Sequence, residues 1–247
     1  MRIAGAVRAA VVMAACGVLV TSCGSGDDSA KKQDDADPGQ GKNTHARAVD
    51  PKRIPDVGDR FQSKIPKNSQ QVLAVYGEGE DSAKSSIVLY TKSGPKDATW
   101  EKTRSWSGHN GRKGWTTNHR EDDKRSPVGV FTLTDAGGVL PDPGAKLSYS
   151  QSTSMQAPHY WPKPYWHDFD YVIAIDYNRV KGTPPSDPTR PQGRSKGGSM
   201  WVHMDHGSGT SGCVSLSKSG MEYLLRTLDP KLHPVVVMGD KANLKAG

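Results

Sequence analysis

Cysteine is scarce in this chain. Three cysteines occur among 247 residues, at positions 16, 23 and 213. The sequence also contains no basic helix, no nucleic-acid-binding motif and no internal repeat, and no apolar run after residue 22 is long enough to span a bilayer. These absences argue against a nucleic-acid-binding protein, a repeat protein and a protein with several membrane spans. The length suits one well-packed domain.

The first 22 residues are predicted to be a lipoprotein signal peptide. Arg2 and Arg8 form a basic region, and residues 9–20 form an apolar stretch that is short for a membrane span. Val20-Thr21-Ser22-Cys23 then resembles the bacterial lipobox, in which the cysteine is lipidated and becomes the new N-terminus. Lipidation at Cys16 and an uncleaved N-terminal anchor are the alternatives. We expect an exported protein, lipid-anchored to the outer face of the cytoplasmic membrane.

This processing would leave Cys213 without an intramolecular partner. Cys16 would leave with the signal peptide, and Cys23 would carry the lipid. Exported proteins usually pair their cysteines, so a lone one is either a buried apolar residue or a nucleophile. Gly, Ser and Thr precede Cys213 and favour the nucleophile.

The segment between the signal and the domain is polar. Residues 24–68 are rich in Gly, Ser, Asp and Lys, so we expect a lipidated Cys23 followed by a disordered tether over residues 23–70. A flexible segment of this length has a reach of roughly 35–40 Å, enough to hold a domain off the membrane. The sequence does not decide whether residues 49–65 pack on that domain.

The formal net charge is +7. This charge is consistent with a mild attraction to anionic wall polymers, or with a soluble surface that happens to be basic.

Residues 71–240 are predicted to form one catalytic domain of the mainly β class. Short apolar runs separated by turn residues favour a β-sandwich-like fold, with residues 171–177 as its clearest core strand. One or two short helices are expected, one of them from a capping box at Ser219 to Pro230, followed by a last strand at residues 234–238. Residues 241–247 would be a tail.

Two local features need interpretation. Residues 159–169 concentrate Tyr, Trp and Pro, and such a loop either walls a groove or covers a sheet edge. In residues 199–216, an apolar run ends at His203, and three glycines then allow a hairpin-like return to Cys213. This return would place the thiol within hydrogen-bond reach of an imidazole, as nucleophilic catalysis requires.

Two stretches resemble one family, the L,D-transpeptidases of bacterial cell walls. Gly114-Trp115 followed by residues 126–131 (Ser-Pro-Val-Gly-Val-Phe) is similar to the family's Gly-Trp…Pro-x-Gly-x-Phe stretch. His203 followed by residues 210–216 (Thr-Ser-Gly-Cys-Val-Ser-Leu) resembles its His-x9-Thr-Ala-Gly-Cys-Val form. The chain departs from many members in having Ser211 directly before Gly212, and Ser215 where Arg or Asn is common.

The resemblance implies cysteine-dependent acyl transfer on peptidoglycan tetrapeptide stems. Cys213 would attack the carbonyl of the third stem residue and release D-Ala, and an amine of a neighbouring stem would then take the acyl group to form a cross-link. His203 would be the base, and pairing with it is expected to raise the thiolate fraction. The N–H groups of Gly212 and Cys213 are the oxyanion candidates.

Other residues near this motif have open roles. His206 competes with His203 as the base, and His206 and Ser211 are candidates for binding substrate. Asp205 could orient the base or be a solvated turn residue. The remaining histidines are expected at the surface or in loops, and His159 and His167 are the first candidates for exceptions.

Three alternatives remain at the level of the sequence. Water as the acceptor would make the protein an L,D-carboxypeptidase. His203, His206 and Cys213 could instead hold zinc, although no known zinc signature is present. An inactive wall-binding lipoprotein is the third. We expect no cofactor or metal, and as partners the stem peptides and, through the lipid, the membrane; the oligomeric state is open.

Overall fold

A computed structural model describes residues 50–94 and 96–246. These described residues form one compact unit. The predicted signal peptide, Cys23 and the tether up to residue 49 lie outside the described residues. None of the helices in the described ranges is long and apolar enough to cross a bilayer.

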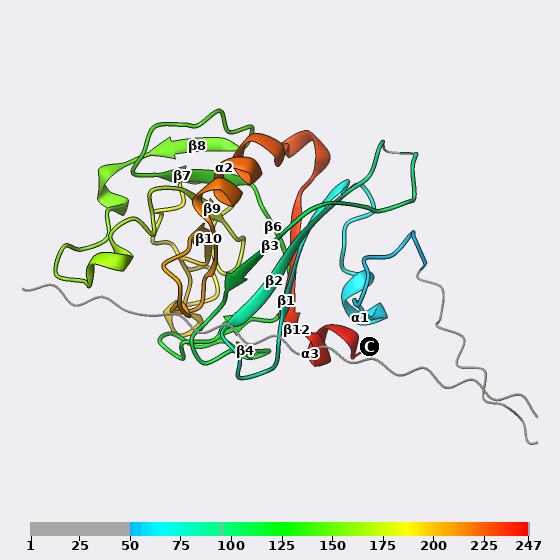
Figure 1. The fold of residues 1–247 in the computed structure, drawn as a ribbon, viewed down its shortest axis with the longest axis horizontal. Helices are drawn as coiled ribbons and strands as arrows, with labels where there is room; N and C mark the ends of the chain where they lie inside the picture. Colours follow the sequence, from blue (N-terminus) through cyan, green and yellow to red (C-terminus); the bar gives the residue numbers. More distant parts are fainter. Residues whose placement is uncertain (1–49, 95, 247) are drawn as a thin grey trace, which may run out of the picture. The chain divides into compact units, whose positions relative to one another are not determined.

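One curled sheet of ten strands organises this unit, in the order β6-β12-β1-β2-β3-β11-β10-β9-β7-β8 (Figure 1). The mainly β prediction is therefore confirmed, with one continuous sheet. The strands β4 and β5 pair separately. The bounds are β1 (Gln71–Gly77), β2 (Lys84–Thr91), β3 (Glu101–His109), β4 (Trp115–Thr116), β5 (Ser126–Pro127), β6 (Gly129–Thr132), β7 (Asp135–Gly138), β8 (Ser148–Gln151), β9 (Val172–Ala174), β10 (Trp201–Met204), β11 (Val214–Leu216) and β12 (Val235–Asp240).

Strand β1 is buried on both faces because cores lie on both sides of it. Side chains alternate across a strand, so Leu73 and Val75 enter one apolar cluster, whereas Val72 and Ala74 enter the other. The first cluster includes the apolar face of helix α2 (Lys218–Thr227), and the sequence predicted this helix. Its N-cap is Ser217, whose side chain accepts from the Gly220 N–H, so the helix begins two residues before the predicted capping box.

The second cluster corrects both predicted domain boundaries. Helix α1 (Asp59–Gln62) buries Phe61, and Ile54 is buried with it, although residues up to 70 were expected in the tether. Helix α3 (Lys241–Lys245) buries Leu244 of the predicted tail. The packed body thus extends beyond residues 71–240 at both ends. Short amphipathic segments of this kind are missed because four or five residues show no periodicity. The other short helices are η1 (Thr153–Met155), η2 (Lys163–Tyr165), η3 (Arg194–Lys196) and η4 (Pro230–Leu232).

The return from β10 to β11 differs from the predicted hairpin. The two strands are neighbours, as expected, but they run parallel, with Val202 opposite Val214 and His203 opposite Ser215. Residues 205–213 therefore travel back along the sheet before β11 begins. Hydrogen bonds to a remote segment hold this path, from Thr210 N to Asn110 O and from Arg112 N to Thr210 O.

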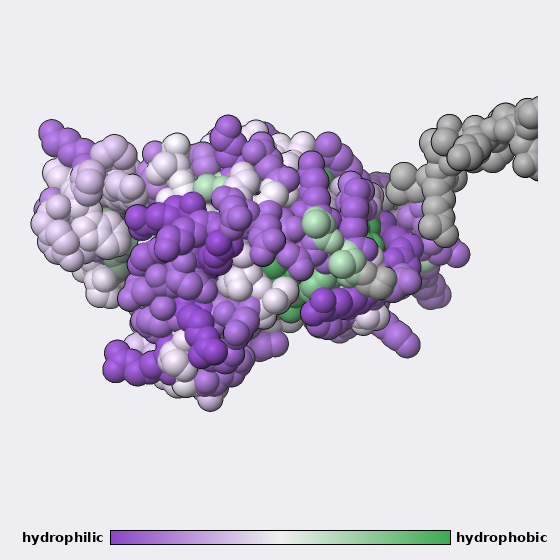
Figure 2. Space-filling model, turned by 90° about the horizontal axis from the view of Figure 1, so that it is seen from below, coloured by the Kyte–Doolittle hydropathy of each residue, from purple (hydrophilic) through white to green (hydrophobic). Residues whose placement is uncertain are grey.

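The surface seen in Figure 2 is mostly polar, with one short apolar strip right of its centre and smaller apolar patches elsewhere. The pale lobe at its left side corresponds in position to the projecting segment around η1 and η2 in Figure 1. This segment contains the aromatic loop 159–169 described above.

Candidate active site

A cavity of about 340 Å³ lies where the β10–β11 connection meets the aromatic loop. It brings together Cys213, His203, His206 and Ser211, all of which the sequence marked as candidates. Its walls are formed by Arg112, Trp161, Pro162, Tyr165, Asp168, Phe169, His203, His206, Gly209, Thr210, Ser211 and Cys213.

The register of β10 and β11 places Cys213 and His203 on one face of the sheet. Val202 and Val214 are opposite each other and fully buried in the first apolar cluster. His203 and Ser215, the next pair along, therefore point to the other face. Cys213 precedes Ser215 by two residues and shares that face. Cys213, immediately before β11, is thus a diagonal neighbour of His203, which lies in β10.

The Cys213 thiol is half-buried and neutral. Its sulfur lies 3.5 Å from the carbonyl oxygen of Ser199, to which the S–H donates, and no hydrogen bond joins it to His203 in the described part of the chain. Burial raises the pKa of Cys213 to about 11. The expected increase in thiolate fraction is therefore wrong for this geometry, because the loss of hydration outweighs any help from the imidazole.

His203 is held in one tautomer by the backbone. Its Nδ1 lies 2.7 Å from the carbonyl oxygen of Met204. A carbonyl can only accept, so the proton is on Nδ1 and Nε2 is left with its lone pair. Burial lowers the pKa of His203, and the charge of Asp168 opposes this only in part. The ring is therefore a neutral base, with the edge-on ring of Phe169 5.4 Å away.

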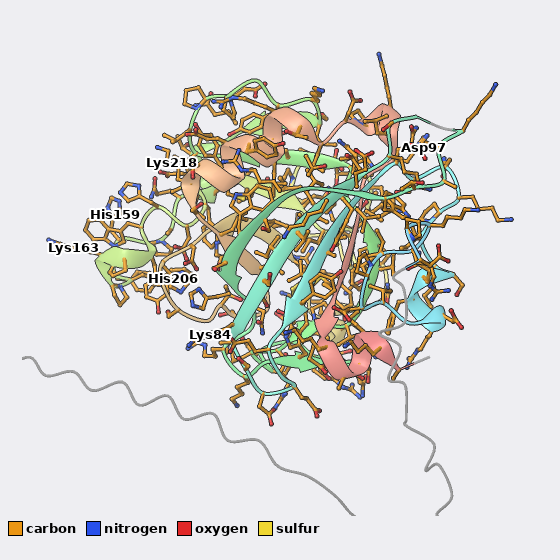
Figure 3. All side chains as sticks on the ribbon, turned by 45° about the vertical axis from the view of Figure 1, so that its right-hand side comes forward. Lys84, Asp97, His159, Lys163, His206 and Lys218 are labelled. Atoms are coloured by element: carbon orange, nitrogen blue, oxygen red, sulfur yellow. The ribbon has the colours of Figure 1, made fainter. Side chains whose placement is uncertain are left out.

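His206 has a different environment from His203. Its Nδ1 lies 3.0 Å from Asp168 Oδ2, and both side chains are almost fully buried. Burial lowers the pKa of His206, but Asp168, together with Asp205 and the Gly209 backbone, raises it, and the net shift is upward. Both ring nitrogens lack a well-aligned hydrogen bond. His206 is thus the more cationic of the two histidines, which suits it less as a base. Figure 3 shows it between the sheet and the loop marked by His159 and Lys163.

The Thr210 hydroxyl fixes the turn that precedes Cys213. The O–H donates to the carbonyl of Cys213 at 2.6 Å, and the hydroxyl oxygen accepts from the Gly212 N–H at 3.1 Å. Gly212 was a predicted oxyanion donor, but its N–H is engaged within the turn. Gly212 has a φ of +147°, and an added Cβ would lie 3.1 Å from Arg125 O, so a side chain fits poorly there.

Ser126 is a positioning residue that the sequence analysis quoted but gave no role. It is fully buried, and its hydroxyl donates to the Gly212 carbonyl at 2.6 Å while accepting from the Gly111 N–H at 2.9 Å. It therefore links the first stretch of the resemblance to the cysteine turn. The only advance signal was its place in that stretch.

Asp205 does not orient the base, and it is not a simple solvated turn residue. One of its oxygens accepts from the Ser215 hydroxyl at 2.7 Å and lies 2.8 Å from His109 Nδ1. Burial opposes ionisation of Asp205, yet these hydrogen bonds lower its pKa overall. Ser215, which stands where many relatives have Arg or Asn, thus joins β11 to the end of β10.

The aromatic loop walls the cavity. Phe169 packs edge-on against both His203 and Trp201, and Tyr165 lies 4.2 Å from His206 between ring centroids. Trp161 also lines the cavity, whereas Tyr160 is 86% exposed and Trp166 packs on His159. This settles the open question about the loop in favour of a groove wall.

The remaining histidines differ in how far their side chains are exposed. His119 lies in a loop, as expected, but its side chain is buried, with Nδ1 3.0 Å from Asp123 Oδ1. His167 is exposed and pairs with Asp170. Across residues 50–94 and 96–246, no group of three His, Cys, Asp or Glu side chains is placed to hold a metal ion. The rings of His203 and His206 are stacked, at an angle of 12° and 6.4 Å between centroids.

The neutral thiol has a measurable consequence. A small alkylating agent reacts with the thiolate, so its rate with Cys213 should rise about tenfold per pH unit from pH 7 and level off near pH 11. The rate of iodoacetamide labelling, followed by intact mass between pH 6 and pH 11, measures this profile. A plateau already present at neutral pH would instead indicate a preformed thiolate–imidazolium pair.

Comparison with known families agrees with this geometry. The family model of YkuD, the L,D-transpeptidase catalytic domain, matches residues 61–237, which contain every residue of the cavity. A search of curated proteins found no match. The match covers well over half of the chain, and its span includes both stretches that carried the resemblance. The chain therefore belongs to the L,D-transpeptidase catalytic domain family, whose members act on peptidoglycan stem peptides.

Proposed function

We propose that Cys213 is the nucleophile of an L,D-transpeptidase that cross-links tetrapeptide stems, with His203 as its base. One observation carries the proposal. The tautomer of His203 set by the Met204 carbonyl leaves Nε2 as an acceptor, and Cys213 lies on the same face of the sheet in the same cavity. A nucleophile and a general base need this arrangement of atoms.

In the first half-reaction, the thiol and the imidazole both begin neutral. The thiol proton moves to His203 Nε2 as the sulfur attacks the carbonyl of the third stem residue. The C–S bond forms, and the carbonyl oxygen becomes an oxyanion. When that intermediate collapses, the C–N bond to D-Ala breaks, and the proton on Nε2 passes to the leaving amine. A thioester remains, and His203 is neutral again.

The raised pKa of Cys213 fits this sequence of steps. A thiol that stays protonated until the substrate arrives resists oxidation and adventitious alkylation, because the thiolate is the reactive form. Proton transfer and attack then occur together. Of the two predicted oxyanion donors, the Gly212 N–H is already bonded to the Thr210 hydroxyl, so the Cys213 N–H is the one that would bind the oxyanion.

In the second half-reaction, a neutral amine of a neighbouring stem attacks the thioester. Its proton passes to Nε2 as the C–N bond forms, and the departing sulfur takes that proton when the C–S bond breaks. Water in the same role would release a tripeptide stem and make the protein a carboxypeptidase. The ratio of cross-linked dimer to tripeptide among the products distinguishes the two acceptors.

Cys213→Ala should abolish the covalent adduct with a tetrapeptide stem or a carbapenem, since no sulfur is available to form the thioester. His203→Asn should slow acylation by about 10²–10⁴-fold, because an amide cannot accept the thiol proton. Intact mass spectrometry and the rate of D-Ala release measure these effects.

The matched control for the base is His206→Asn, in the same cavity. It should slow acylation less than His203→Asn, since the His206 ring is paired with Asp168. A persisting adduct on Cys213→Ala would contradict the assignment of the nucleophile. A larger loss with His206→Asn than with His203→Asn would reverse the assignment of the base.

We also propose that lipidation of Cys23 anchors the protein to the outer face of the cytoplasmic membrane. The lipobox-like sequence supports this, and the polar segment up to residue 49 would connect the anchor to the packed body. In cells, Cys23→Ala should move the chain from washed membranes to the soluble or unprocessed fraction. Unchanged lipid labelling and membrane retention of Cys23→Ala would contradict the proposal.

A further inference from the structure

The cavity contains one permanent cation whose charge nothing in its lining balances. Arg112 lines the cavity, and no carboxylate lies within 4.0 Å of its guanidinium in the described ranges. The only acidic side chain of the lining, Asp168, is already paired with His206. The other cavity walls are mainly aromatic or small. Arg112 therefore gives one end of the cavity a net positive charge.

Backbone contacts fix Arg112 beside the cysteine turn. The Arg112 N–H donates to the Thr210 carbonyl at 2.8 Å, and an added Cβ on Gly209 would lie only 2.6 Å from the Arg112 Cα. Its Nη2 donates to the Ser211 hydroxyl at 3.2 Å. Ser211 precedes Cys213 by two residues, so the guanidinium and this hydroxyl lie together close to the nucleophile. The remaining guanidinium N–H groups are suited to a planar anion.

The substrate of the proposed reaction carries an anion at the corresponding place. The leaving residue of a tetrapeptide stem ends in a free carboxylate, and consecutive Cα atoms are about 3.8 Å apart, so this carboxylate lies within one residue of the attacked carbonyl. A carboxylate that enters a half-enclosed cavity must exchange its hydration for other hydrogen bonds. Arg112 and Ser211 supply such donors next to Cys213.

We propose that Arg112, positioned by Ser211, binds the α-carboxylate of the D-amino acid that leaves in the acylation step. This inference rests on the proposed function, since it assumes that a tetrapeptide stem acylates Cys213. It makes Arg112 a specificity determinant for stems that end in a carboxylate one residue beyond the attacked carbonyl. Stems without that charge lose the contact.

The test compares two stems that differ in one group. One is a tetrapeptide with a free C-terminal carboxylate, and the other is the same peptide with a C-terminal carboxamide. For the unaltered protein, single-turnover acylation of Cys213 should be about tenfold to a hundredfold faster with the carboxylate, the range typical of charge-assisted hydrogen bonds. Arg112→Gln should lose most of this preference by slowing the reaction of the carboxylate stem alone.

Two further variants control for charge and for folding. Arg112→Lys keeps the charge but not the fork of donors, so it should retain only part of the preference. Lys113→Gln removes the adjacent cation, which is exposed and does not line the cavity, and should leave the preference unchanged. Iodoacetamide labelling of Cys213 at high pH should be equal in all variants if the turn is intact.

The possible failures are distinguishable. If the unaltered protein is acylated by both stems at equal rates, or if Arg112→Gln slows both equally, the assignment of Arg112 is overturned and the proposed function stands. If neither stem acylates Cys213 in the unaltered protein, the proposed function fails and this inference fails with it.

Discussion

The hydrogen bond from His203 Nδ1 to the Met204 carbonyl is the interaction on which the site depends. A backbone carbonyl has no proton to give, so this bond fixes both the position of the ring proton and the direction in which the free nitrogen points. An acidic partner would stabilise the imidazolium and raise the pKa of the ring. The neutral carbonyl leaves burial as the dominant influence, and the ring remains a neutral base.

The parallel pairing of β10 and β11 places this base near its nucleophile. In a parallel pair of strands the side chains of opposed residues project to the same face, so the register that buries Val202 against Val214 places His203 opposite Ser215 and diagonal to Cys213. The connection between the strands must then run back along the sheet, and residues 110–112 hold it there. Within the connection, Thr210 bonds to the Cys213 carbonyl and Asp205 accepts from Ser215, and Ser126, from a distant part of the chain, donates to the Gly212 carbonyl. The active site is thus stabilised by contacts distant in sequence.

Local sequence was sufficient to predict the candidate residues but not their state. Cys213 stood out because it was the one cysteine left without a partner, and His203 because it ended an apolar run ahead of a glycine-rich turn. The mainly β class followed from short apolar runs, and the helix at residues 218–227 from its apolar stripe. These are properties of single segments, which local patterns describe well.

The errors arose where distant segments determine the outcome. The connection between the parallel strands β10 and β11 is held by residues 110–112, nearly a hundred positions earlier in the chain, and no local pattern reveals these contacts. The neutral state of the thiol depends on enclosure of the cavity, and the aromatic residues 161–169 supply much of it. The Gly212 N–H was an obvious oxyanion donor until the Thr210 hydroxyl was seen to accept from it. Residues 54–62 and 241–245 looked too short and polar to belong to the core, yet each contributes a fully or almost fully buried apolar side chain.

The central claim is that His203, before substrate binds, is a neutral imidazole with its proton on Nδ1 and its lone pair on Nε2. Nitrogen-15 NMR of the histidine rings tests it most directly, with the His203 signals assigned by comparison with a His203→Gln variant. At neutral pH the account predicts one protonated ring nitrogen, Nδ1, and one unprotonated nitrogen, Nε2, with the Cys213 thiol un-ionised. Two protonated nitrogens at that pH, or a proton on Nε2 alone, would contradict it.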